Sequence, residues 1–134
     1  MKSLQERFED KGIRPSQQRL RIMKYLEGRH DHPSVDMIYD ALVREMPTIS
    51  KTTIYNTLRL MVEKALVADL TISGQGVRYD PVTEPHSHFL CRKCGQVIDL
   101  EDIECPCLKK EVQGNKVEEV RVYLIGLCKK CHRR

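Results

Sequence analysis

The sequence lacks an apolar run near the roughly 18 residues that a membrane-spanning helix requires. It also lacks a hydrophobic signal segment behind its charged first residues, so we expect a cytoplasmic protein with no membrane partner. Internal repeats and low-complexity segments are absent too. With 40% hydrophobic and 31% charged residues, the chain of 134 residues is expected to fold as a globular protein.

A strong net charge is also missing, because the formal value is only +4 at pH 7. Charge alone therefore does not identify a nucleic-acid partner. Its placement is more informative, since residues 1–30 carry eight Lys and Arg against four Asp and Glu. Such a local excess suits phosphate contacts, although an ordinary solvated helix surface has the same composition.

Helical patterns dominate the residues before about 80. Apolar residues at helical spacing predict four short helices: one with Leu4 and Phe8 that Gly12 closes, one that Gly28 ends, one from Val35 that ends before Pro47, and one that includes Ile54, Leu58, Met61 and Val62. We expect Pro15 to begin the second helix, and Ser34 and Ser50 to cap the third and fourth. A hairpin of residues 66–72 and 77–80 follows, around a turn at 73–76.

Helices followed by a two-stranded wing are the order of a winged helix-turn-helix, whose last helix enters the major groove of DNA. The polar face of the fourth predicted helix consists of Lys51, Thr52, Tyr55, Asn56 and Arg59. A polar helix face is often merely solvated, so the DNA-binding interpretation depends on the order of the elements as well.

The residues after about 80 change in character. They predict short strands at 89–91, 96–100 and 117–126, with a polar, partly helical stretch at 103–113. The last strand is apolar on both faces, and about 50 residues cannot cover it alone, so a dimer partner and a metal are expected. We predict an α+β protein, with a winged helix-turn-helix at residues 1–80 and a small α/β dimerisation domain with a four-cysteine zinc site at 81–134.

Four of the six cysteines form two Cys-x-x-Cys pairs, Cys91/Cys94 and Cys128/Cys131. Two such turns complete a tetrahedral zinc site without an open position, which makes the site structural rather than catalytic. Two disulfides or four idle thiols are the alternatives. Cys105 and Cys107 lack a partner pair, and we interpret them as incidental thiols, with a redox or second metal role as the alternative.

A second candidate metal site consists of histidines and aspartates. His86 and His88 are two residues apart, so in a strand both imidazoles point to the same side. The other members are Asp80, Asp99 and, in the loop before the third helix, His32. Three imidazoles and two carboxylates suit Fe(II) or Mn(II), with Zn(II) also possible. An isolated histidine such as His30 is more often an ordinary surface residue.

These motifs resemble the ferric uptake regulator (Fur) family, and its peroxide-responsive PerR branch most closely. The resemblance rests on segments in family order: 32–39, the recognition-helix segment 50–59 with its Tyr55-Asn56 pair, 78–80, His86-x-His88, Cys91-x-x-Cys94-Gly95, 97–99 and Gly126-x-Cys128-x-x-Cys131. It spans roughly residues 10 to 131. Asp99, where Fur proteins more often carry Glu, favours the PerR branch.

The resemblance implies a metal-dependent repressor that binds inverted-repeat operator DNA as a homodimer. It implies structural zinc at the four paired cysteines and a regulatory Fe(II) or Mn(II) site at His32, Asp80, His86, His88 and Asp99. It further implies that the residues facing DNA are Thr53, Tyr55, Asn56 and Arg59, with Arg14 and Arg19 on phosphates. We add Lys51, from the same helix face, to the DNA contacts.

In the PerR branch, peroxide reacts at bound Fe(II) and oxidises a ligating histidine, here expected to be His32 or His86. The chain departs from the family in two ways. Val120 stands where many members have a histidine of an additional metal site, so we expect that site to be absent. The segment 101–116 is shorter than usual, which leaves the helix of the family's dimerisation domain in question.

Three other interpretations remain open. The repressor could respond to iron, manganese or zinc without peroxide chemistry. A zinc-stabilised protein-interaction module would keep the cysteines but leave the polar helix face and His32 unexplained. A metalloenzyme would need room for a small-molecule substrate, whereas five protein ligands leave little, and no Gly-rich phosphate loop is present. We therefore predict that the protein is not an enzyme.

Overall fold

The computed structural model describes residues 2–71, 76–83, 87–100 and 110–133. The chain divides into two compact units, Met1–Thr83 (unit 1) and Glu84–Arg134 (unit 2). The boundary predicted from the sequence lies after residue 80. The roles assigned to the two domains stay predictions.

Unit 1 begins with four helices, α1 (Leu4–Asp10), α2 (Gln17–Leu26), α3 (Val35–Leu42) and α4 (Lys51–Glu63). Each follows a serine whose Oγ accepts a hydrogen bond from a backbone N–H in the first turn, and these serines are Ser3, Ser16, Ser34 and Ser50. The predicted caps Ser34 and Ser50 are confirmed. The predicted start at Pro15 is wrong, because Ser16 is the cap and α2 begins after it.

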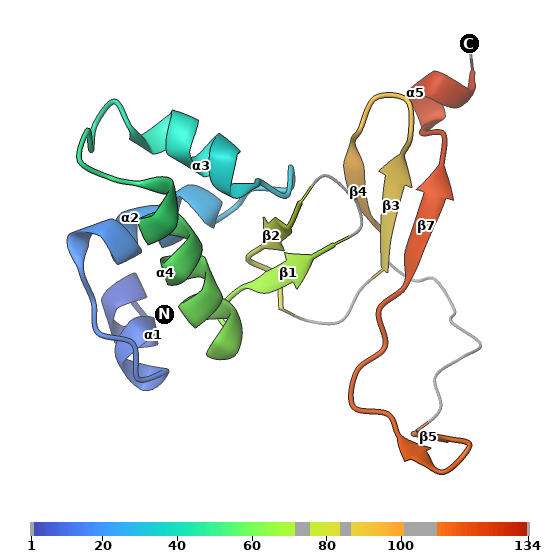
Figure 1. Ribbon diagram of the computed structural model, residues 1–134, viewed down its shortest axis with the longest axis horizontal. Helices are drawn as coiled ribbons and strands as arrows, with labels where there is room; N and C mark the ends of the chain where they lie inside the picture. The colour runs from blue at the N-terminus through green and yellow to red at the C-terminus, as the bar shows by residue number, and fades with distance from the viewer. Residues whose placement is uncertain (1, 72–75, 84–86, 101–109, 134) are drawn as a thin grey trace. The chain divides into compact units, whose positions relative to one another are not determined.

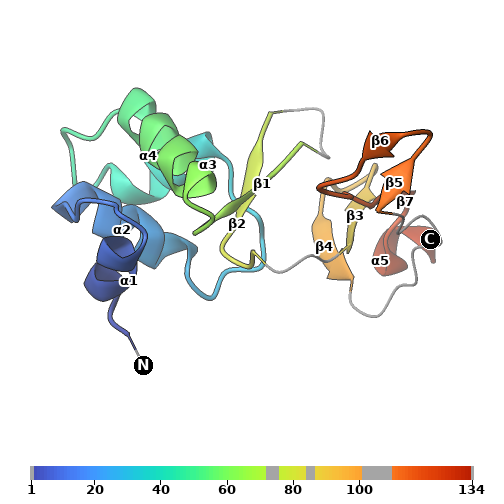
Figure 2. The same cartoon turned by 90° about the horizontal axis from the view of Figure 1, so that it is seen from below.

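The core of unit 1 lies between these helices (Figures 1 and 2). Helix α1 contributes the fully buried Phe8, and the other three helices contribute buried apolar side chains at helical spacing, among them Ile22, Leu26, Ile38 and Leu58. Burial of one such side chain stabilises the fold by about 1.5–3 kcal/mol. Unit 1 therefore has a hydrophobic core of its own.

Two short strands complete unit 1. Strand β1 (Ala68–Leu70) pairs antiparallel with β2 (Arg78–Asp80), with Ala68 opposite Asp80. Both are shorter than the predicted hairpin arms, and most of the predicted turn lies outside the described residues. Tyr79 of β2 is buried in the helical core and its backbone N–H donates to the carbonyl of Pro33, so β2 is attached to the loop before α3.

Unit 2 is built on a three-stranded sheet in the order β4-β3-β7 (Figure 1). Strand β3 (Ser87–Cys91) pairs antiparallel with β4 (Val97–Leu100) and parallel with β7 (Tyr123–Gly126). Among the described residues of unit 2, the buried apolar side chains are Cys91, Val97 and Cys128. So small a core requires additional stabilisation.

The last strand is shorter than predicted. Residues 117–122 are not part of β7, although the carbonyl of Val122 accepts a hydrogen bond from the N–H of His88 at 3.2 Å. The N–H of Val117 bonds instead to the carbonyl of Lys110. Nor is the strand covered on both faces within one chain, because Leu124 is 41% and Ile125 53% exposed. The expected cover for this apolar surface is a second copy of the chain.

The segment before β7 also differs from the prediction. Residues 110–113 are not helical, because β5 (Glu111–Val112) and β6 (Asn115–Lys116) form a hairpin. Its central residues Gln113 and Gly114 both have positive φ, as two-residue hairpin turns of type I′ require. The rest of the predicted helical stretch, residues 103–109, lies outside the described residues. Helix α5 (Lys129–His132), which the sequence analysis did not predict, follows β7.

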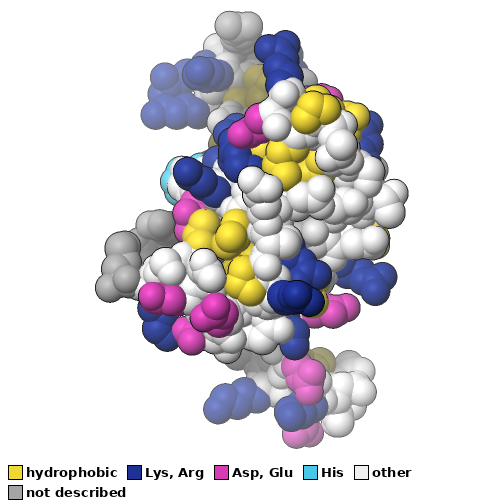
Figure 3. Space-filling view, turned by 90° about the vertical axis from the view of Figure 1, so that its left-hand side faces the viewer, with side chains coloured by type: hydrophobic (Ala, Val, Ile, Leu, Met, Phe, Trp, Pro, Cys, Tyr) yellow, Lys and Arg dark blue, Asp and Glu magenta, His cyan; other side chains and the backbone are white. Residues whose placement is uncertain are grey.

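Hydrophobic side chains appear in small groups among charged and polar ones on the face that Figure 3 presents. None of the helices in the described ranges is both long and apolar enough to cross a membrane.

Candidate metal centres

Four cysteine sulfurs gather in unit 2. Cys91 ends β3 and Cys94 lies in the turn that follows, while Cys128 caps α5 and Cys131 lies within it. The four sulfurs all lie within 4.8 Å of one another. The parallel pairing of β3 with β7 sets Cys91 beside Gly126, and the N–H of Arg92 donates to the carbonyl of Gly126 at 2.8 Å. The backbone therefore brings the two Cys-x-x-Cys turns together.

The thiol chemistry fits a tetrathiolate metal site. Backbone N–H groups of Cys94 and Cys128 lower the pKa of Cys91 to about 6, whereas the hydrogen bond to the Cys128 sulfur raises the pKa of Cys131 to about 12. Four adjacent sulfurs cannot all ionise unless a cation compensates their charge. Zn²⁺ supplies that charge and accepts four sulfurs tetrahedrally at about 2.3 Å.

One half of the predicted His/Asp site lies in unit 1. His32 Nε2 is 3.4 Å from Asp80 Oδ2, and both side chains are at most 2% exposed. Asp80 ends β2, where its Oδ1 accepts a hydrogen bond from the N–H of Val82 at 2.8 Å. An imidazole and a carboxylate at this separation, with so little exposure, suit two ligands of one divalent cation.

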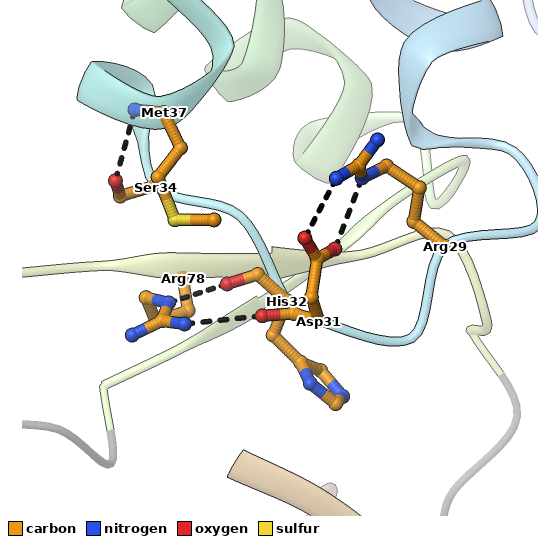
Figure 4. A network of polar contacts seen from close by, with 6 residues as sticks. All are labelled: Arg29, Asp31, His32, Ser34, Met37 and Arg78. Carbon is orange, nitrogen blue, oxygen red and sulfur yellow. Dashed lines mark hydrogen bonds and ion pairs between the residues drawn. The ribbon is translucent and has the colours of Figure 1, made fainter. Parts of the chain in front are cut away.

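The backbone around His32 is firmly held, as Figure 4 shows. His32 has a φ of 51°, a left-handed conformation that is uncommon outside glycine. The guanidinium of Arg78 donates to the carbonyls of His32 and Asp31, the latter at 3.0 Å. The Arg29 guanidinium donates two hydrogen bonds to the Asp31 carboxylate, of 3.0 and 2.8 Å, and these bonds lower the pKa of Asp31. Arg78 and Arg29 therefore fix the loop that presents His32.

Arg78 belongs to the segment 78–80 of the family resemblance, but the sequence predicted no role for it. The one sequence feature that could have pointed to Arg78 is its position two residues before the candidate ligand Asp80. The interaction with a loop 46 residues away could not be read from the sequence.

We expect Arg78→Ala to weaken Mn(II) binding about tenfold, because a ligand whose support is lost must be ordered when the metal binds. Arg78→Lys should rescue only partly, since one ammonium cannot reproduce the planar fork of a guanidinium. Calorimetric titration of zinc-loaded protein with Mn(II) measures the effect. The control is Arg21→Ala, which removes an exposed ion pair with Glu45 in the same unit. Equal Mn(II) affinity in the Arg78 and Arg21 variants would contradict this role.

The other half of the predicted site lies in unit 2. His88 on β3 stands opposite Asp99 on β4, and His88 Nε2 is 3.2 Å from Asp99 Oδ1. The His88 side chain is 5% exposed, and its ring packs against Tyr123 of β7 with ring centroids 6.2 Å apart. His88 and Asp99 therefore face each other on adjacent strands, and their role as metal ligands stays a prediction. His86 lies outside the described residues.

Helix α4 carries the predicted DNA-contacting face. The side chains of Lys51, Thr52, Tyr55, Asn56 and Arg59 are all exposed, on the side opposite the buried Ile54 and Leu58. Three predicted contacts of this helix have partners within the protein. Lys51 pairs with Asp36 at 3.1 Å, and Thr53 Oγ1 accepts from Ser50 Oγ at 2.9 Å. Arg59 is within 3.8 Å of Glu63, one turn further along.

The two predicted phosphate contacts lie next to each other at the start of α2. Arg14 is exposed, and the Arg19 guanidinium donates to the carbonyl of Arg14 at 2.8 Å. The structure therefore places a pair of positive charges there, while its role in DNA binding stays a prediction.

A helical unit with a two-stranded wing and an exposed polar last helix, followed in the chain by a tetrathiolate site, defines a metal-binding winged-helix protein. The model of the ferric uptake regulator family matches residues 10–125. The chain therefore belongs to the ferric uptake regulator family, whose members are metal-dependent transcriptional regulators. The predicted family and fold class are confirmed.

Two relatives are similar over nearly all of this chain. The peroxide operon regulator of Bacillus subtilis is 35% identical over 139 residues, covering 100% of this chain and 94% of the relative. The peroxide-responsive repressor PerR of Staphylococcus epidermidis is 38% identical over 125 residues, which cover 90% of this chain and 82% of the relative. Among solved structures, the Vibrio cholerae ferric uptake regulator matches with a TM-score of 0.76 and 24% identity, over 94% of this chain and 100% of that one, which supports the fold.

Proposed function

We propose that this chain is a peroxide-responsive, metal-dependent repressor that binds inverted-repeat operator DNA as a homodimer in the cytoplasm. The observation that carries the proposal is the pair of buried imidazole–carboxylate sets, His32 with Asp80 and His88 with Asp99. Such sets suit a cation that accepts nitrogen and oxygen ligands, as Fe(II) and Mn(II) do. The two relatives named as a peroxide operon regulator and a peroxide-responsive repressor supply the second line of support.

In this proposal one regulatory ion binds His32, Asp80, His86, His88 and Asp99. The first two ligands belong to unit 1 and the others to unit 2, so the ion would restrict how the two units move. In a dimer this restriction would select the separation of the two α4 helices that fits half-sites about one helical turn apart, ~34 Å. Metal would thereby control DNA affinity without contacting DNA.

The winged-helix unit would contact the operator. The exposed residues of α4 would reach base edges and backbone in the major groove, with Arg14 and Arg19 on phosphates. Lys51 would have to leave Asp36 to contact DNA. Exposed pairs of this kind contribute only about 0–1 kcal/mol, so a phosphate would compete readily with Asp36.

Bound Fe(II) would promote a two-electron oxidation by hydrogen peroxide, in which the C–H of a ligating imidazole takes one oxygen atom of the peroxide and the other oxygen leaves as water. The protein's part is to hold His32 or His86 beside the ion. An oxidised ligand would bind metal poorly, and DNA affinity would fall. This role is regulatory, and we propose no turnover of a small-molecule substrate. The four cysteines would hold zinc throughout.

The proposal predicts that Fe(II)-loaded protein, prepared without air, binds operator DNA and releases it after stoichiometric peroxide. Operators are first selected from a random-sequence duplex pool with Mn(II)-loaded protein. Peptide mass spectrometry should then find one added oxygen on His32 or His86 in the Fe(II) form only, with the Mn(II) form as the matched control. Metal-dependent binding without this modification would instead indicate a metal-responsive repressor, and equal binding with and without metal would contradict the proposal.

A further inference from the structure

Positive charge gathers around the two Cys-x-x-Cys turns of unit 2. Arg92 and Lys93 lie between the first pair of cysteines, Lys129 and Lys130 between the second pair, and Arg133 follows α5. All five side chains are exposed. We call this set the zinc-end patch. Its members come from two distant parts of the sequence, and the cysteines that flank them converge, with their four sulfurs within 4.8 Å of one another.

Among the described residues, no acidic side chain pairs with the patch. In the sequence, 91–98 and 120–134 contain no Asp or Glu. The nearest acidic residues on either side are engaged elsewhere, Asp99 with His88 at 3.2 Å and Glu119 with Arg121 at 2.8 Å. Within the described parts of the chain, no ion pair involves a member of the zinc-end patch.

Compensation of the metal site accounts for only part of this charge. A zinc ion with four thiolates carries a net charge of −2, so two of the five cations would neutralise it and three would remain. These cations also project from short turns closed by metal ligands, so they would be presented on a rigid base. Exposed cations in surplus over the local anions are the usual feature of a surface that contacts a polyanion.

We propose that the zinc-end patch is a second nucleic-acid contact, which binds the phosphate backbone of DNA without reading its sequence. The inference rests on the proposed DNA-binding function, since DNA held by α4 would be present at high effective concentration. Arg and Lys bind phosphates through charge-assisted hydrogen bonds, and each contact releases counterions from DNA. The patch therefore adds to DNA affinity a salt-sensitive contribution that is independent of the winged-helix unit.

The test compares two double substitutions of equal charge in the dimeric, metal-loaded protein. Lys129→Gln with Lys130→Gln removes two charges from the patch. Lys110→Gln with Lys116→Gln removes two exposed charges from the β5–β6 hairpin, which in Figure 1 lies at the other end of β7 from α5. Fluorescence anisotropy with a random-sequence 40-base-pair duplex is measured from about 50 to 200 mM salt.

We expect the patch variant to lose about two units of the slope of log K against log salt for each protomer in contact, because one phosphate contact contributes about 0.9. The hairpin variant should keep the parental slope. Lys129→Arg with Lys130→Arg should also keep it, which separates phosphate contact from a structural role. Zinc content and the thermal transition of each variant show whether the fold is intact.

Two outcomes would overturn the inference. An equal loss of slope in both Gln variants would mean that only net charge matters. An unchanged slope in the patch variant would mean that the surface does not touch DNA, and a partner protein with an acidic surface would become the alternative. Failure of the proposed function is distinguishable, because the parental protein itself would then show no metal-dependent DNA binding.

Discussion

Replacing Cys91 by serine should remove zinc from the protein and unfold unit 2. Structural zinc sites contribute apparent binding energies of about 10–16 kcal/mol to folding. Among its described residues, unit 2 buries few apolar side chains, and two of them, Cys91 and Cys128, are zinc ligands in our assignment. Unit 1, with its own helical core, should stay folded. The two units therefore respond differently to one substitution.

Hydrogen exchange followed by mass spectrometry separates these responses, since it reports residues 1–83 and 84–134 independently. Protection should be lost in unit 2 and kept in unit 1, and size-exclusion chromatography should show monomers. Cys105→Ser and Cys107→Ser are the matched controls, because these two cysteines stand outside the predicted zinc site. A Cys91→Ser protein that remains dimeric and protected without zinc would show that the thiols do not hold unit 2 together.

Asp80→Asn should abolish the dependence of DNA affinity on the regulatory metal. Asparagine keeps the size of the side chain and the acceptor for the Val82 N–H, but it removes the negative charge beside His32. We expect Mn(II) affinity to fall at least 100-fold, and the gain in operator affinity on adding Mn(II) to disappear. If that gain is 100-fold in the parent, the variant loses about 2.7 kcal/mol of coupling between the two sites.

Operator binding by Asp80→Asn is measured with and without Mn(II), alongside Asp99→Asn, which makes the corresponding change in unit 2. Both variants should retain zinc and the dimer. The control is Asp10→Asn, which changes an exposed carboxylate at the end of α1 and should behave like the parent. If either variant at position 80 or 99 keeps full metal dependence, that carboxylate is not a ligand of the ion that controls DNA binding.

Local rules accounted for much of unit 1. Serine caps and helical apolar spacing are interactions between residues three or four apart, so Ser34, Ser50 and the buried side of α4 were recognisable in advance. The same rules misjudged the start of α2, because Pro15 and Ser16 are both favourable at a helix start and only the observed Ser16–Arg19 hydrogen bond decided between them.

Unit 2 was harder to predict, because its elements depend on distant partners. Val120 and Val122 favour a strand as much as Tyr123 does, but the register with β3 begins only at Tyr123. The hairpin at 111–116 depends on two positive φ values, which glycine indicates at position 114 but glutamine does not at 113. Strand propensity is therefore a weaker guide here than helix capping was in unit 1.

The sequence alone determined the chemistry of this protein: which residues offer sulfur, imidazole or carboxylate to a metal, and which helix presents polar side chains to DNA. Those properties belong to individual residue types and to short spacings. Only the tertiary structure decided which ligands become neighbours, as with Cys91 and Cys128, and which side chains support them, as Arg78 supports the His32 loop. Contacts between residues 30 to 50 positions apart depend on the tertiary path of the backbone, which no local sequence pattern specifies.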